Sequence, residues 1–197
     1  CIRDRVEDAQ SFVRPSVYVR LPDVTRELGE HARPIRDFLY SPGDTSVSIR
    51  LLGDLNDRAT LDILLRALEA METTPFRLSF VHTGTSDGLL SEWLLQAMHA
   101  GALSNMSHND LYHALESNHV AASLENLRQT YHIPTTKYSW SQISLAFSQA
   151  FELKHAGPII LLNGQSLDHI QGVSQFDIES VVAWEDEVHV QALLNAC

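Results

Sequence analysis

The stretch GPIILLNGQSL, from Gly157 to Leu167, decides how the second half of the chain folds. Its apolar run from Ile159 to Leu162 contains no polar residue, which is typical of a strand buried on both faces. Asn163-Gly164 follows, and this pair favours a two-residue turn because a type I′ turn needs positive φ at both central positions. The stretch therefore predicts a β-hairpin whose second strand returns over Gln165 to Ile170.

Upstream of the hairpin, the sequence changes between strand and helix patterns. Ser46 to Leu55 is predicted to be a strand, because apolar residues alternate along it up to Gly53. Between Arg58 and Glu72, leucines recur at the spacing of one helix face. Phe76 to His82 alternates again and is predicted to be a second strand. Two strands joined by one helix are expected to lie parallel in a sheet, with a right-handed crossover.

The region from about residue 86 to residue 156 is predicted to be a helical insertion, and Gln175 to Asn195 a last helix. The resulting order is βαβ, helical insertion, ββα, which is that of a thioredoxin-like α/β fold. Residues 46–197 are assigned to this domain, and the proline-punctuated residues 1–45 to an N-terminal arm or linker. Helix starts within the insertion are expected at Asp87, at Ser107 or Asn109, near Val120, and at Ser139 or Ser141.

The charge and hydropathy of the chain argue against two classes of partner. The net charge is −11 and the pI is about 5.2, so binding of nucleic acid through phosphate neutralisation is not expected. No apolar run approaches the ~20 residues of a membrane span, so no membrane partner is expected.

The start of the first helix has no nucleophile. In a redox-active thioredoxin fold a thiolate occupies this position, where the helix dipole stabilises it. Here the residues are Asp54-Leu55-Asn56-Asp57, whose side chains can cap the helix but cannot attack a disulfide. We therefore predict a redox-inactive domain. A thiol-activating transferase of the glutathione type ranks behind a binding module, because the helix start has no Ser, Tyr or Cys.

Three further patterns concern modification and metal binding. Cys1 and Cys197 can pair if the termini meet, and a segment that merely ends at two cysteines is an equal alternative. Asn105-Met106-Ser107 is an N-glycosylation sequon between two predicted helices, although about one such triplet is expected by chance in this length. The ten histidines are scattered, and His108 and His113 miss the i, i+4 spacing of a helical zinc pair. No metal site is predicted, and the histidines are expected on the surface.

Three segments together resemble a known family. They are RPIRDFLYSPGDTSVSIRLLGDLNDRATLDILLRALEAMETTPFRLSFVHTG (residues 33–84), SEWLLQAMHAGALS (91–104), and GPIILLNGQSL with FDIESVVAWE (157–167 and 176–185). They are similar to the thioredoxin-like domains of the folding-sensor region of UDP-glucose:glycoprotein glucosyltransferases, in which an apolar strand ends in Gly-Asp and an apolar residue. The resemblance covers about Ser46 to Trp184 and points to the third or fourth such domain, by different counts.

The resemblance implies a location and a role. Members of this family reside in the endoplasmic reticulum lumen and add one glucose to the N-glycans of misfolded glycoproteins. UDP-glucose and Ca²⁺ are expected at a separate catalytic domain, so this segment is expected to be non-catalytic and to hold no cofactor. Its partners would be misfolded glycoprotein clients and neighbouring thioredoxin-like domains of the same chain. The alternative is a redox-inactive thioredoxin-like chaperone or adaptor domain.

Two structural expectations follow from this assignment. The fold implies a cis peptide bond before Pro158, at the start of a strand. A folding sensor also needs apolar surface that many sequences can contact. We expect a partly exposed patch on the last helix, which would cover apolar sheet surface and yield to clients. Its residues are Ile178, Val181, Val182, Trp184 and Val188.

Overall fold

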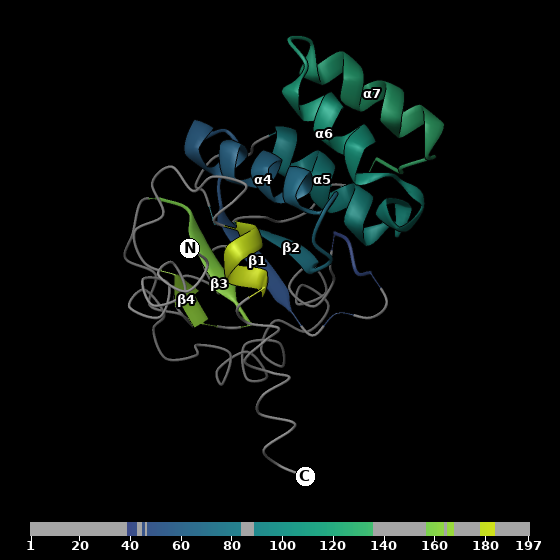
Figure 1. Cartoon of the computed structure of the whole chain (residues 1–197). Helices are drawn as coiled ribbons and strands as arrows, with labels where there is room; N and C mark the ends of the chain where they lie inside the picture. The colour runs from purple at the N-terminus through teal and green to yellow at the C-terminus, as the bar shows by residue number, and fades with distance from the viewer. Residues whose placement is uncertain are drawn as a thin grey trace, which may run out of the picture.

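The computed structural model describes residues 39–42, 45, 47–83, 89–135, 157–163, 165–167 and 178–183. Within them, four strands form a sheet in the order β2-β1-β3-β4 (Figure 1). β1 and β2 run parallel, β3 is antiparallel to β1, and β4 is antiparallel to β3, which confirms the predicted parallel pair and the predicted hairpin. The strands are β1 (Ser48–Gly53), β2 (Arg77–His82), β3 (Ile159–Leu162) and β4 (Gln165–Leu167).

The turn of the hairpin also fastens β3 to β1. Asn163 has φ of 44°, the positive value that the turn requires. Its Oδ1 accepts hydrogen bonds from the backbone N–H of Ser48 at 2.8 Å and from the Ser48 hydroxyl at 2.9 Å. The Asn163 N–H in turn donates to the Ser48 carbonyl at 2.8 Å. Asn163 therefore both shapes the turn and sets the alignment of β3 against the start of β1.

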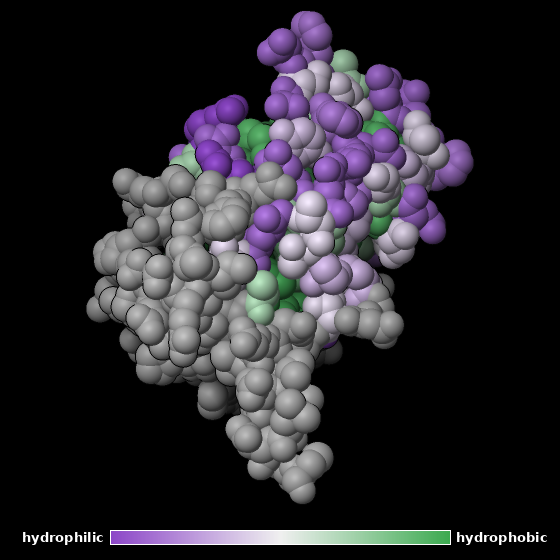
Figure 2. Space-filling view, in the orientation of Figure 1, coloured by the Kyte–Doolittle hydropathy of each residue, from purple (hydrophilic) through white to green (hydrophobic). Residues whose placement is uncertain are grey.

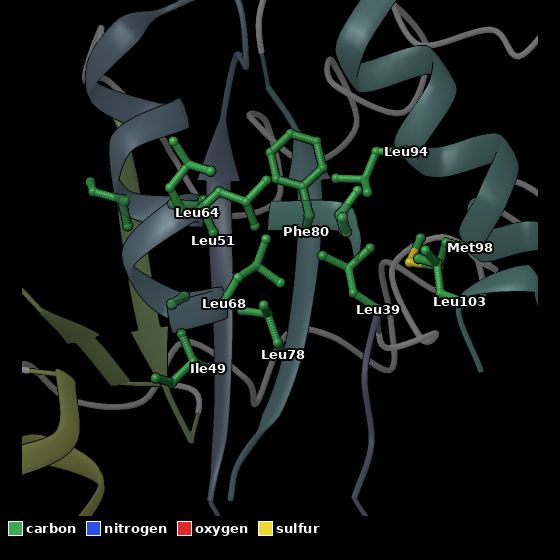
Figure 3. Close-up of a cluster of buried hydrophobic side chains, with 14 of the residues drawn as sticks. Leu39, Ile49, Leu51, Leu64, Leu68, Leu78, Phe80, Leu94, Met98 and Leu103 are labelled. Carbon is green, nitrogen blue, oxygen red and sulfur yellow. The ribbon is translucent and has the colours of Figure 1, made fainter. Parts of the chain in front are cut away.

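The helix α4 (Arg58–Ala70) joins β1 to β2 and covers one face of the sheet. Its leucine stripe, predicted to be buried, is buried in the structure. Leu64 and Leu68 point at the strands, and Leu94 of the next helix lies beside Phe80 (Figure 3). Because side chains alternate along a strand, β1 and β2 each present one apolar set to this helix. The buried residues of this face are Ile49 and Leu51 of β1 and Leu78 and Phe80 of β2.

Four helices follow β2 before the hairpin in the described part of the insertion. Three of the predicted helices are confirmed, and Ser107 is the N-cap of the second, since its side chain accepts from the Asn109 N–H. Asp87 and the fourth predicted helix, from Ser139 or Ser141, lie outside the described residues. The elements are α5 (Leu89–His99), the 3₁₀ helix η3 (Ala102–Asn105), α6 (His108–Glu116) and α7 (Val120–Thr130).

The helices of the insertion contact α4 and one another. α6 lies against both α4 and α7. Trp93 of α5 is 5% exposed, and its Nε1 donates to the Leu124 carbonyl of α7 at 3.0 Å. Arg128 of α7 donates to Gln96 of α5 at 3.0 Å. These hydrogen bonds hold α5 and α7 together at the end of the domain away from β4 (Figure 1).

Part of the segment assigned to the arm lies on the edge of the sheet. Tyr40 forms an isolated antiparallel bridge with Leu78 of β2, and Leu39 is 2% exposed within the core. The Tyr40 hydroxyl donates to the Ser107 carbonyl at 3.3 Å, and its ring meets His108 edge to face. Residues 39–40 therefore connect β2 to the start of α6.

Among the described residues, no helix has the length and apolar character needed to cross a membrane.

Candidate functional site

The junction between β1 and α4 is the position at which a redox-active fold of this kind would carry its thiolate. Asp57 is the N-cap of α4, and its carboxylate accepts from the Ala59 N–H at 3.4 Å and from the Thr60 hydroxyl at 3.2 Å. The Asp54 carboxylate accepts from the Asn56 N–H at 2.9 Å. The predicted capping role is confirmed for Asp57, whereas the Asp54 carboxylate bonds within the loop before the helix, and neither group is a thiol nucleophile.

Gly53 brings the end of β1 unusually close to the first turn of α4. A Cβ built on Gly53 would lie 2.7 Å from both Cγ2 and Oγ1 of Thr60. Thr60 is 1% exposed and bonded to Asp57, so it has no free space into which to move. The glycine of the Gly-Asp pattern is therefore required by packing between strand and helix.

A buried polar group lies beside this junction, and sequence reasoning missed it. His82 ends β2 and is 2% exposed, which contradicts the expectation that the histidines lie on the surface. Its Nδ1 is 3.0 Å from the hydroxyl of Ser91 on α5 and 4.0 Å from Oδ1 of Asp54. The signal was available, because His82 continues the alternation of Leu78 and Phe80 toward the core.

These three side chains do not have the geometry of a hydrolytic triad. In a triad the histidine uses one ring nitrogen for the serine and the other for the carboxylate, whereas both contacts here are made by Nδ1. The Ser91 side chain is 0% exposed, and its hydroxyl also accepts from the Leu55 N–H at 3.4 Å. The cluster therefore ties β2, α5 and the β1–α4 loop together, and offers no serine to a substrate.

Pro158 lies at the same end of the sheet. It precedes Ile159, which pairs with Leu52 of β1. No peptide bond between described residues is cis, so the predicted cis bond before Pro158 is wrong. The strand starts in extended geometry directly after Pro158, and a trans bond is favoured by ~0.5–1 kcal/mol where no sharp turn is imposed.

The last helix is described over residues 178–183, drawn in yellow in Figure 1. Ile178 is 5% and Val182 is 2% exposed, so these two predicted patch residues belong to the core rather than to an exposed surface. Val181 is half-buried and packs against the same core. Residues 178 and 182 are four apart and so share one face of the helix, and that face is directed inward. The other two patch residues, Trp184 and Val188, lie outside the described residues.

One side-chain contact links this helix to α4. Glu179 accepts a hydrogen bond from the hydroxyl of Thr73, which follows the end of α4. The same hydroxyl also lies within hydrogen-bond distance of the Ala70 carbonyl. The segment 178–183 therefore lies beside the C-terminal end of α4, at the opposite end of that helix from Asp57.

The remaining candidate residues are placed as follows. Asn105 is exposed at the end of η3, whereas Cys1 and Cys197 lie outside the described residues. Among the described residues, no group of three or more His, Cys, Asp or Glu is placed to hold a metal ion.

A family of thioredoxin-like domains matches residues 23–195 of the chain. No curated protein matches it. Among solved structures, the chain is similar to the Trx3 domain of UGGT in a detergent-unbound form, with 13% identity, a TM-score of 0.52, and coverage of 84% of this chain and 99% of that chain. A detergent-bound form of the same domain has 18% identity, a TM-score of 0.39, and coverage of 75% of this chain and 99% of that chain. At 13% identity, the likeness to the detergent-unbound form concerns the fold alone.

Proposed function

Because the chain belongs to this family of thioredoxin-like domains, we propose that it is a non-catalytic substrate-recognition domain of a UDP-glucose:glycoprotein glucosyltransferase. The parent enzyme would act in the endoplasmic reticulum lumen, where it would reglucosylate misfolded N-glycoproteins. UDP-glucose and Ca²⁺ would bind at its catalytic domain, outside this segment. The partners of this segment would be misfolded clients and the neighbouring thioredoxin-like domains.

The observation that carries the proposal is the chemistry of the β1–α4 junction. A domain that keeps the thioredoxin-like sheet, yet has Asp54 and the N-cap Asp57 at the thiolate position, lacks the thiol that a redox step needs there. A binding role is compatible with that substitution, and the fold of the UGGT Trx3 domain supports the particular parent.

We place client recognition at the last helix, with the helix acting as a cover. Ile178 and Val182 are buried, so a client would meet them, and the core surface beneath them, only after the helix has moved away. Within residues 178–183 the helix buries Ile178 and Val182, and the free-energy cost of opening such a segment grows with the apolar area that becomes exposed. Weak binding to many sequences is what such an intermittently exposed apolar surface would support.

The test measures binding of a denatured glycoprotein and of its native form to the 197-residue chain. Denatured client is expected to bind and native client is not, since only the denatured form exposes apolar segments. Equal binding of the two forms, or none, would reject a folding-sensor role.

A pair of variants locates the binding surface. Val182→Ala removes two buried methyl groups, worth ~1.5 kcal/mol of docking at ~0.8 kcal/mol each. The population with the helix detached should therefore rise roughly tenfold. Ala183→Ser changes the adjacent exposed position and is the matched control. If the helix is a cover, Val182→Ala binds more denatured client and Ala183→Ser binds as the unmodified chain does. Unchanged binding in a folded Val182→Ala chain would remove this helix from the mechanism.

A further inference from the structure

Asn105 stands at a corner of the helical insertion where a large group can be attached without displacing packed atoms. It is the last residue of η3 and its side chain is exposed. Within the described part of the chain, the side chain of Asn105 makes no hydrogen bond, and its neighbour Ser104 is exposed as well. A substituent on the Asn105 amide would therefore meet solvent.

The residue between the two polar members of the sequon holds the corner in place. Met106 is 4% exposed, with extended backbone angles of φ −96° and ψ 130°. Because successive side chains of extended backbone point to opposite sides, the buried Met106 directs Ser107 outward, while Asn105 is exposed at the end of η3. Ser107 is exposed, and its hydroxyl caps α6 through the Asn109 N–H at 3.2 Å. The folded structure thus displays both polar residues of Asn105-Met106-Ser107.

We propose that Asn105 carries an N-linked glycan. The donor would be an oligosaccharide linked through a diphosphate to a lipid. The Asn105 amide nitrogen forms a bond to the anomeric carbon of the first sugar, and the bond from that carbon to the diphosphate oxygen breaks. The lipid diphosphate leaves with the bonding electron pair, and the proton lost from the amide balances the charge. No atom is oxidised or reduced.

A glycan at Asn105 would limit how neighbouring domains can pack against this one. A glycan at Asn105 requires the corner between η3 and α6 to face solvent, so no neighbouring domain can pack over it. On the face drawn in Figure 2, the surface over the helices is mostly hydrophilic, which fits that requirement. Glycosylation in nature rests on the proposed function, because only a chain in the secretory compartment meets the donor.

The experiment expresses the chain in cultured eukaryotic cells with an added, cleavable signal peptide. The secreted chain is compared before and after digestion with an amide-cleaving glycosidase, which leaves an aspartate at the attachment position. A loss of mass on digestion and an Asn105→Asp change in the peptide map are expected. An undigestible chain, or an aspartate elsewhere, overturns the proposal.

Four variants separate the sequon from the helix cap. Asn105→Gln removes the acceptor, and Ser107→Asp removes the hydroxyl of the sequon while keeping a good N-cap. Both are expected to lose the glycan completely, whereas Ser107→Thr, which keeps cap and sequon, retains it. Asn195→Gln removes the rarer Asn-Ala-Cys triplet at the end of the chain and should also retain the glycan. A glycan that survives Asn105→Gln and disappears in Asn195→Gln overturns the proposal.

The added signal peptide makes entry into the secretory pathway independent of the natural location. Absence of the glycan would therefore reject the modification of Asn105 and leave the client-binding test untouched. Failure of the client-binding test would reject the folding-sensor role without altering the expected glycan on the secreted chain.

Discussion

The two ends of α4 differ in the contacts that surround them. At the N-terminal end, the capping groups of Asp57, the Gly53–Thr60 contact and the buried His82 cluster fasten the helix to the strands. At the C-terminal end, the segment 178–183 adds two buried side chains and the Thr73–Glu179 hydrogen bond. The end that carries chemistry in redox-active folds is here joined to the strands by polar and packing contacts, and the proposed cover lies at the other end.

Truncation of a buried leucine or isoleucine side chain should have the largest effect on stability, and it tests whether α4 and the segment 178–183 are held equally firmly. Leu64→Ala in α4 is expected to lower the free energy of unfolding by ~2–5 kcal/mol, because Leu64 is 0% exposed and the surrounding core cannot collapse fully. Ile178→Ala deletes as many carbon atoms but should cost less if the proposed cover detaches, since a detached segment 178–183 need not enclose a cavity. Urea unfolding measures both values. Equal losses would mean that the last helix is as firmly held as α4.

Gly53→Ala tests how rigid the β1–α4 junction is. The new methyl group would overlap Thr60, so a loss of ~1–3 kcal/mol in the free energy of unfolding is expected. Gly157→Ala is the matched control, because a Cβ there meets no atom within 4 Å, and it should change stability by less than ~0.5 kcal/mol. In a Thr60→Ala background the cost of Gly53→Ala should shrink. An undiminished cost in that background would contradict the Gly53–Thr60 contact as its cause.

Tyr40, at the edge of β2, is expected to make the stability of the domain depend on pH. Burial, followed by the Asp110 carboxylate and Tyr131, raises the pKa of Tyr40 well above its ordinary value of 10.0. In the unfolded chain Tyr40 ionises near pH 10, so its contribution to stability is complete below that pH and is lost as pH rises toward the folded-state pKa. By pH 11 the loss from one such group is about 1.4 kcal/mol.

Tyr40→Phe removes this titration while leaving the ring in place. Tyr112 and Tyr131, whose pKa values are also raised, remain in the variant, so the difference between the two chains isolates Tyr40. Urea unfolding at pH 9 and pH 11 should show a smaller fall in stability for Tyr40→Phe, by about 1 kcal/mol. Identical falls would show that residue 40 is not buried in solution.

The last prediction is that the chain has no measurable disulfide-reductase activity. The chain has no Cys-x-x-Cys, and capping carboxylates occupy the start of α4, so insulin reduction should stay at background. A Cys1→Ser/Cys197→Ser double variant should give the same result as the unmodified chain. Reduction above background that persists in the double variant would contradict the redox-inactive assignment.

Local patterns in the sequence were sufficient for most of the described elements. The leucine spacing of α4, the alternation of β1 and β2, and Asn163 at the turn each depend on neighbours within one element, which is why they could be predicted. The capping role of Asp57 could be predicted for the same reason, because an N-cap bonds to a backbone group two or three residues away.

Other features depended on contacts between distant segments. Tyr40 joins the edge of β2 although its own neighbourhood resembles a linker, and the polar partner of the buried His82 is Ser91 of a different element, α5. The bond before Pro158 is trans because the chain enters β3 without a sharp turn, whereas the resemblance to thioredoxin-like folds had predicted a cis bond.

The sequence by itself therefore determined the order of elements, the parallel pair, the hairpin and the loss of a redox nucleophile, because each rests on residue type and short-range spacing. Only the tertiary structure decided which apolar faces are covered. We predicted that Ile178 and Val182 form part of an exposed patch, yet both are buried, because other residues of the hydrophobic core pack against them. Periodicity identifies an apolar face, and the partner that buries it comes from elsewhere in the chain.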